Sequence, residues 1–398
     1  MTETRQQAAR GRSGDGGADD WKDFEHTGPG TLAGRYMRRF WQPVYLAEDL
    51  PPGRATPIRI MSEDFTLYRG EGGLAHVLAF RCAHRGTQLS TGWVEQDNIR
   101  CFYHGWMYGP DGQCVEQPAE PEPFAQKVQI RSHPTEEYLG LIFVFLGEGD
   151  PPPLPRYPQY EQGGLVLNQK YLRGCNYFQN LENDPVHGAF VHARGRKRPI
   201  PVVTAQESAW GVTAYSTYPG GSVRTTQWGL PDMHLVTTPP STRSNLWRDA
   251  LSWFVPVDDY SHIDIRMHYV RVTDEESRRT HLERRAAREA IADETYDPAK
   301  MAQVVLAGKM HISDFFDKAD QLIEDDVAQI GQGLIADRSS ERLGRSDANV
   351  IMIRKLWEQE LRALAEGRPL REWRFSEETM PRDDGGLRRN QEAAAAAR

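Results

Sequence analysis

Two short stretches of the chain each carry one cysteine and one histidine. Cys82 and His84 lie in RCAHRG, and Cys101 and His104 lie in CFYHGW. Structural zinc motifs usually pair like with like, a Cys-x-x-Cys with a His-x-x-x-His, whereas here each stretch supplies one of each. A Rieske [2Fe–2S] centre uses such mixed pairs, because one iron takes two thiolates and the other takes two imidazoles. The spacing therefore predicts a Rieske cluster held by these four residues.

The chain between the two stretches is long enough to let them face each other. Sixteen residues separate His84 from Cys101, among them the glycine-containing LSTGWVEQDN, which allows an outgoing and a returning strand. Two opposed loops can then give one ligand each to each iron. A structural zinc site, and two buried cysteines beside two incidental histidines, are the alternative interpretations.

A second group of possible metal ligands lies in NLENDPVHGAFVH, residues 180–192. His187 and His192 are five residues apart, which places them about 140° apart on a helix and does not imply a same-face HExxH zinc site. A helix that bends or loosens after Gly188 could still bring both imidazoles to one ion. Two histidines and a distant carboxylate form the facial triad of non-haem Fe(II), which leaves positions open for dioxygen. The alternative is a pair of hydrogen-bonded core histidines.

Two kinds of domain are expected to position these residues. Residues 36–146 contain short apolar runs bounded by Gly, Asp-Gly and Pro, which indicate strands and tight turns. The Pro-rich GEGDPPPLPRYPQY is typical of a stiff connection between domains. Beyond it, alternating runs such as HIDIRMHYVRV indicate antiparallel strands, and VIMIRKLWEQELRALAEG has helical spacing. The fold class is α+β, with expected boundaries of a disordered tail 1–35, an all-β domain 36–150, a second domain 151–375 and a disordered tail 376–398.

Composition narrows the class of partner. The formal net charge is −8, so the chain has no basic footprint for nucleic acid or an anionic membrane. The longest apolar run, LGLIFVFLG, is too short to span a bilayer, and the N-terminus lacks the apolar region of a signal peptide. Four cysteines in 398 residues do not form a disulfide framework. We expect a cytoplasmic protein of two domains that binds a small molecule or another protein.

Together the motifs resemble those of a known family. RCAHRG, CFYHGW followed by GPDGQC, and NLENDPVHGAFVH are similar to those of the α (oxygenase) subunits of Rieske non-haem iron oxygenases, over residues 36–373. The stretch IEDDVAQIGQGLIADRSSERLGRSD further resembles the phthalate-oxygenase-like branch. The resemblance implies a Rieske β-domain followed by a helix-grip antiparallel sheet over a mononuclear Fe(II), and homotrimers. It also implies a flavin and [2Fe–2S] reductase that draws electrons from NADH or NADPH.

The implied activity is that of a terminal oxygenase. Dioxygen and the delivered electrons hydroxylate an aromatic substrate, by cis-dihydroxylation or by a monohydroxylation that can end in O- or N-demethylation. A Rieske electron-transfer protein without oxygenase activity would keep the cluster and make no use of His187 and His192. A zinc-stabilised binding module is the other alternative.

Two adjacent carboxylates compete for the third iron position. In helical projection Asp326 lies on the face defined by Leu322, Ile323 and Val327, whereas Asp325 points away from it. Periodicity alone would choose Asp326. The register of the branch, counted back from the ADRS stretch, implies Asp325, and we take Asp325 as the ligand with Asp326 as the alternate.

The resemblance also implies roles for two residues before the histidines. Asp184 would hydrogen-bond His187 on its own chain and His104 of the partner subunit, and so connect the two metal sites. Asn180 would lie near the iron without binding it tightly. The alternatives are an ordinary helix acid for Asp184 and a capping helix residue for Asn180. Trp228 falls on an expected strand, where an aromatic residue is more often core than pocket wall, and is given no role.

Overall fold

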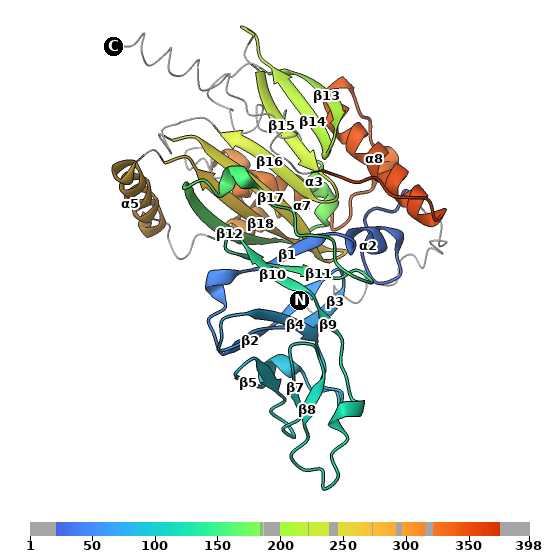
Figure 1. The fold of residues 1–398 in the computed structure, drawn as a ribbon. Helices are drawn as coiled ribbons and strands as arrows, with labels where there is room; N and C mark the ends of the chain where they lie inside the picture. The colour runs from blue at the N-terminus through green and yellow to red at the C-terminus, as the bar shows by residue number, and fades with distance from the viewer. Residues whose placement is uncertain are drawn as a thin grey trace.

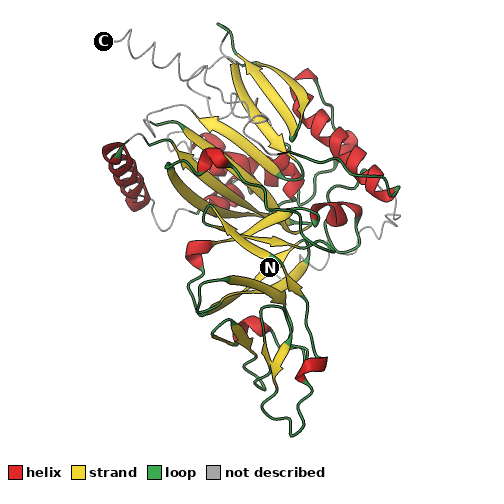
Figure 2. Ribbon diagram, in the orientation of Figure 1, coloured by secondary structure: helices red, strands yellow, loops and turns green. Residues whose placement is uncertain are grey.

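The computed structural model describes residues 21–183, 186, 200–221, 223–238, 246–272, 274–291, 297–314 and 321–374. The chain forms a β-rich N-terminal half and a second half built on one large antiparallel sheet flanked by helices (Figures 1 and 2). The fold class predicted from the sequence is therefore confirmed. Among the described residues, no helix combines the length and the apolarity that crossing a membrane requires.

The N-terminal half consists of three small antiparallel sheets. Their short strands follow from apolar runs that glycines interrupt: Gly112, for example, takes a φ of +81° at the turn between β7 and β8. One sheet has the order β1-β11-β10, with β1 Trp41–Leu46, β10 Thr135–Tyr138 and β11 Leu141–Phe145. The next is β2-β3-β4-β9, with β2 Arg54–Ile60, β3 Glu63–Arg69, β4 Ala75–Ala79 and β9 Ser132–His133. The last is β5-β6-β7-β8, with β5 Trp93–Glu95, β6 Asn98–Arg100, β7 Met107–Tyr108 and β8 Cys114–Glu116.

The β5–β8 sheet lies at the end of the molecule farthest from the large sheet, at the bottom of Figure 1. It has a hydrophobic cluster of its own, in which Cys82 and Cys101 pack with Leu89, Ile99 and Tyr108. The small domain thus presents the two cysteine–histidine stretches at its tip.

The second half is built on a seven-stranded sheet, in which β13 to β18 form a meander and β12 pairs with β18 at one edge. Its order is β12-β18-β17-β16-β15-β14-β13, and every neighbouring pair is antiparallel. The strands are β12 Leu165–Arg173, β13 Val202–Ser208, β14 Gly211–Thr217, β15 Val223–Gly229, β16 Met233–Thr238, β17 Arg248–Asp258 and β18 Ser261–Val270. One face packs on the N-terminal half, as where Trp253 meets Phe143 of β11 with ring centroids 5.7 Å apart. Both halves therefore share one continuous core.

Helices cover the remaining surfaces of the large sheet. The short α3 (Tyr177–Leu181) and α7 (Gln321–Ile330) lie over the face opposite Trp253, and α8 (Ala348–Ala365) packs on β13 and β14. The other helices among the described residues are α2 Leu32–Met37, α5 Glu275–Ile291 and α6 Pro298–Leu306. Single 3-10 turns occur at Ala47–Asp49, Leu89–Thr91, Ala125–Lys127, Pro158–Tyr160, Arg338–Ser340 and Arg345–Asp347.

The expected N-terminal tail 1–35 is too long. Residues 21–35 are packed: Phe24 stacks on Phe178 of α3 with ring centroids 4.2 Å apart, and Thr31 caps α2 by accepting a hydrogen bond from the Gly34 amide. A Cβ at Gly34 would lie 2.4 Å from the Thr27 carbonyl oxygen, so glycine is needed for the close approach. The expected tail 376–398 lies outside the described residues.

Candidate metal centres

The two cysteine–histidine loops have nearly the same backbone structure. The Gly86 amide donates to the Cys82 carbonyl at 2.9 Å, and the Gly105 amide donates to the Cys101 carbonyl at 3.0 Å. In both loops the cysteine amide donates to the carbonyl five residues later, at 2.9 Å. The two glycines have φ values of +75° and +77°, in the left-handed region that favours glycine. The RCAHRG and CFYHGW stretches therefore fold as a matched pair of turns.

The four side chains are sorted by type within the pair of loops. The thiols of Cys82 and Cys101 are buried at 2% exposure, and burial raises the pKa of Cys101. His84 and His104 are more exposed than the two cysteines, and their ring centroids lie 4.6 Å apart. Desolvation, followed by the charge of His84, lowers the pKa of His104, which favours a neutral imidazole able to bind a metal. Paired thiols inside and paired imidazoles outside fit the donor set of a Rieske cluster.

Two aromatic residues support these loops. The Tyr108 hydroxyl accepts a hydrogen bond from the Ala83 amide at 3.1 Å and lies 3.2 Å from the Cys82 sulfur. Once Cys82 is a thiolate, as a metal cluster requires, the hydroxyl is the donor to that sulfur. Burial raises the pKa of Tyr108, which keeps the hydroxyl protonated. Trp106 stacks on His84 at 4.6 Å, with the rings within 6° of parallel. The sequence analysis missed Tyr108, and its alternation with Trp106 after the second loop is the signal that could have indicated it.

The second predicted ligand group is only partly within the described residues. Asp184, His187 and His192 lie outside them. Asn180 is described, on α3, which ends at Leu181. The structure therefore describes the helix that leads into the histidine stretch and the residues that surround that helix.

The two candidate carboxylates on α7 have different partners. Asp326 is fully buried, and its two oxygens accept hydrogen bonds from the Tyr171 hydroxyl and from Arg173 Nε, the latter at 2.6 Å. Asp325 is partly buried, and its Oδ1 accepts a hydrogen bond from Asn183 Nδ2 at 3.3 Å. The projection that put Asp326 on the core face agrees with its burial. Asp325 is the carboxylate that faces the end of α3.

Asn180 belongs to a buried chain of hydrogen bonds. His262 Nδ1 lies 2.8 Å from the Cys175 carbonyl, which can only accept, so Nδ1 is the donor. His262 Nε2 then accepts from Asn180 Nδ2 at 3.0 Å, and Asn180 Oδ1 accepts from Gln329 Nε2 at 3.1 Å. Burial lowers the pKa of His262 to about 3, which keeps its ring neutral. Both ends of the Asn180 amide thus connect α3 with β18 and α7, through two residues that no sequence pattern indicated.

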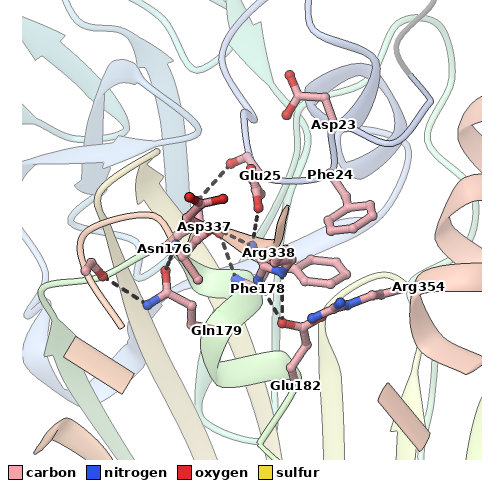
Figure 3. Close-up of polar contacts among 12 residues, drawn as sticks. Asp23, Phe24, Glu25, Asn176, Phe178, Gln179, Glu182, Asp337, Arg338 and Arg354 are labelled. Atoms are coloured by element: carbon pink, nitrogen blue, oxygen red, sulfur yellow. Dashed lines mark hydrogen bonds and ion pairs between the residues drawn. The ribbon is translucent and has the colours of Figure 1, made fainter. Parts of the chain in front are cut away.

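Charged side chains also fix the residue that follows α3. The Glu182 carboxylate is bound by Arg338 at 2.7 Å and by Arg354 (Figure 3). Arg338 also pairs with Glu25 of the N-terminal segment, and Arg354 pairs with Glu341. All five side chains are less than a third exposed, so solvent screens these pairs less than pairs on an open surface. The network therefore anchors the beginning of the histidine stretch from three directions.

Comparisons with known proteins agree with this arrangement. A Rieske [2Fe-2S] domain model matches residues 40–135. The chain is 31% identical to the tert-butanol monooxygenase / tert-amyl alcohol desaturase oxygenase subunit of Aquincola tertiaricarbonis, over 87% of this chain and 77% of that protein. It is 29% identical to the phenoxybenzoate dioxygenase subunit alpha of Ectopseudomonas oleovorans, over 85% of this chain and 84% of that protein.

A solved structure shares the fold at lower identity. The fluorene-bound oxygenase of carbazole 1,9a-dioxygenase, in complex with its ferredoxin, is 19% identical with a TM-score of 0.61, over 87% of this chain and 94% of that one.

These observations define the class. The chain belongs to the Rieske non-haem iron oxygenases, and it is a terminal oxygenase (α) subunit with a Rieske [2Fe–2S] domain. The predicted family, enzyme class and function are confirmed.

Proposed function

We propose that the chain hydroxylates a small aromatic substrate at a mononuclear iron bound by His187, His192 and Asp325. One observation carries the proposal: the hydrogen bond from Asn183 to Asp325 brings the α7 carboxylate to the stretch that leads into both histidines. Two imidazoles and one carboxylate are the donor set of the Fe(II) facial triad, which supplies the open coordination positions that dioxygen chemistry needs. The chain contributes these three ligands and the buried polar network that holds α3 against α7.

Asp325 is the better candidate for the third iron ligand, because both oxygens of Asp326 already accept hydrogen bonds from Tyr171 and Arg173. Binding a metal through Asp326 would withdraw a carboxylate from Arg173, which is buried at 1% exposure. An unpaired buried guanidinium is strongly unfavourable. Asp325 instead accepts a hydrogen bond from Asn183, so one of its oxygens already faces the end of α3.

We further propose that Rieske domain 36–150 and catalytic domain 151–375 cooperate between subunits of a homotrimer. Asp184 would hydrogen-bond His187 and His104 of the partner subunit. The imidazoles of His84 and His104 are more exposed than the two thiols, which supports an electron route that leaves the subunit at these two rings. A flavin and [2Fe–2S] reductase, using cytoplasmic NADH or NADPH, would supply the electrons. The solved oxygenase of similar fold is seen with a ferredoxin, which favours a separate electron donor.

The substrate class is the least constrained part of the proposal. The similar proteins named above include a dioxygenase for phenoxybenzoate and a monooxygenase for tert-butanol. Both cis-dihydroxylation and monohydroxylation with demethylation are therefore compatible with this scaffold. We favour an aromatic substrate.

An aerobic screen tests the proposal. The purified protein, a surrogate reductase and NADH are incubated with aromatic acids, aryl ethers and N-methyl compounds under ¹⁸O-labelled dioxygen, and products are identified by mass. We expect one of two oxygen-dependent results from at least one class: a hydroxylated product that carries the label, or the unlabelled phenol or amine together with formaldehyde, because demethylation leaves the label on the released methyl carbon. His187→Ala should abolish either product and keep the visible absorbance of the cluster, because the cluster ligands lie in the other domain. Absence of both kinds of product from every class, or an active His187→Ala protein, would contradict the proposal.

A further inference from the structure

The large sheet has one face that α3 and α7 cover. Four side chains form a row across this face, one from each of the strands β15 to β18. Trp228 on β15 is paired with His234 on β16, His234 with Ser252 on β17, and Ser252 with Arg266 on β18. Directly paired residues of antiparallel strands project to the same face. Trp228 Nε1 donates to the Leu181 carbonyl of α3 at 2.9 Å, which identifies that face. The row therefore lies under the helix that leads into the proposed iron ligands.

His234 is held in this row by aromatic neighbours. Its ring centroid lies 5.1 Å from that of Trp228 and 6.1 Å from that of Phe254. Trp228 and Phe254 are themselves buried at 1% and 2% exposure, so they fix the imidazole and are covered by protein. His234 keeps partial exposure. His234 is thus held between buried rings while the residue itself is only partly buried.

The two ring nitrogens of His234 differ. Nε2 is buried and makes no hydrogen bond with any described residue. Desolvation lowers the pKa of His234 to about 3, so the ring is neutral and carries a single N–H. A buried N–H without an acceptor is rarer than a buried acceptor without a donor, so the lone pair belongs on Nε2 and the proton on Nδ1. The Nδ1–H then defines the ring edge that a ligand can approach, since Nδ1 is not among the described buried atoms that lack a partner.

Charges near His234 favour an anion at that edge. After desolvation, the guanidinium groups of Arg266 and Arg224 are the next causes that lower the pKa of His234, and they outweigh the opposing charge of Asp325. Arg266 is itself oriented by hydrogen bonds to Ser252 and Asp264. The influence of Asp325 also places His234 within electrostatic reach of the proposed iron ligand.

We propose that His234 determines substrate specificity by donating a hydrogen bond from Nδ1 to the carboxylate of an aromatic acid. The inference rests on the proposed function for the location of the reacting carbon, and it adds the chemical group that orients the substrate. The fixed imidazole binds the carboxylate, and the substrate ring extends from this anchor toward the Asp325 side. Arg224 favours the negative charge of the carboxylate, and Arg266 contributes less because it forms an ion pair with Asp264. His234 is a binding residue that does not take part in proton transfer.

Equilibrium dialysis under anaerobic conditions tests the anchor without requiring turnover. The probes are 3-phenoxybenzoate and diphenyl ether, which differ only by the carboxylate. We expect the wild-type protein to bind 3-phenoxybenzoate at least about tenfold more tightly. His234→Leu should weaken the binding of 3-phenoxybenzoate by about 10- to 100-fold, the range of a hydrogen bond to a charged group. The same variant should change the affinity for diphenyl ether by less than about threefold. His234→Gln, which keeps an N–H donor, should recover part of the loss.

The control is His76→Leu. His76 is a partly buried histidine on β4 of the small domain, and its Nε2 also lacks a hydrogen-bond partner among the described residues. The His76→Leu variant should bind both probes with the affinity of the wild type. If His234→Leu unfolds, as circular dichroism would reveal, His234→Ala carries the same comparison. Equal binding of both probes by the wild type, no binding of 3-phenoxybenzoate, or an equal loss of both probes in the variant would each overturn the inference. Failure of the proposed function alone would instead leave the binding difference intact and give no oxygen-dependent product.

Discussion

The two candidate metal centres are built in opposite ways. At the tip of the small domain, each loop is closed by its own backbone, and the hydrogen bonds that shape it span four or five residues. Under α3 and α7, the contacts join residues far apart in sequence: Asn183 and Asp325 are separated by 142 residues, and Arg173 and Asp326 by 153. The first site is a local structure carried by a sheet, and the second exists only once the whole catalytic domain has folded.

This difference has consequences for mutation. A side chain in the cluster loops can be changed with effects confined to the loop and its cofactor. A side chain under α3 and α7 can act on stability, on metal binding or on both, because it also connects distant elements. Adjacent residues on α7 allow the two kinds of effect to be separated.

The largest expected effects come from Asp325→Asn and Asp326→Asn. Asp325→Asn should keep the fold and the cluster absorbance while mononuclear iron is lost and product falls by more than about a hundredfold, beyond the usual range for groups outside the ligand set. Asp326→Asn should destabilise the catalytic domain by about 3–5 kcal/mol, because Arg173 loses its buried partner. Denaturant unfolding and iron analysis of both proteins check the pair. The reverse pattern would make Asp326 the ligand.

The next effect concerns Asp184. Asp184→Asn keeps the shape and removes the charge that is proposed to connect His187 with His104 of the partner subunit. Cluster absorbance and most mononuclear iron should survive, while product formation falls by about a hundredfold, the upper end for residues that orient metal ligands. The measurement is a single turnover of the pre-reduced protein with substrate and dioxygen. Cluster reoxidation at the wild-type rate with a normal product yield would remove Asp184 from the electron route.

A smaller effect is expected at the local site. Tyr108→Phe removes the hydroxyl that points to the Cys82 sulfur. If that hydrogen bond contributes about 1 kcal/mol to the reduced form, the reduction potential of the cluster should fall by about 40 mV for one electron. Cluster content should not change, since all four ligands remain. Potentiometric titration followed by visible absorbance measures the shift, and an unchanged potential would mean that the hydroxyl serves only the Ala83 amide.

The same contrast explains what the sequence could predict. The cysteine–histidine stretches and the α7 and α8 helices are visible because their signals repeat within a few residues. Helical periodicity also predicted that Asp326 is buried. It could not predict that Arg173 binds Asp326, because Arg173 lies on a strand 153 residues away in the sequence. His262 and Gln329 are single polar residues with no local pattern, so only the folded sheet and helix reveal that both hold Asn180.

Composition misled at the N-terminus for a related physical reason. Residues 21–35 contain too few apolar side chains to form a core alone, and they become ordered by packing on α3. Phe24 supplies the ring that stacks on Phe178, and the Tyr177 hydroxyl donates to the Phe24 carbonyl at 2.6 Å. A segment that is ordered only by packing on another domain has the composition of a disordered segment when it is considered by itself.

The smallest expected effect is a pH dependence of that N-terminal segment. His26 Nδ1 lies 2.8 Å from Asp23 Oδ1, and this hydrogen bond raises the pKa of His26 from 6.5 to about 9, with smaller help from the charges of Asp259 and Glu25. Because the folded pKa is the higher one, the contribution to stability is complete below about pH 6.5 and is lost as the pH rises through about 9. The His26 side chain is 43% exposed, so solvent screening limits the contribution to less than about 1 kcal/mol.

The variant His26→Gln tests whether the charge of His26 stabilises the N-terminal segment. The variant should melt about 1–2 °C below the wild type at pH 6, and the difference should vanish near pH 10, because the wild-type histidine is then neutral as well. Amide hydrogen exchange at residues 24–27 should show the same convergence, while exchange in the β5–β8 sheet stays equal in both proteins. If the melting difference persists at pH 10, His26 acts through packing. If exchange at the tip changes as well, the N-terminal segment is coupled to the local site and the separation between the two centres is weaker than their hydrogen bonds suggest.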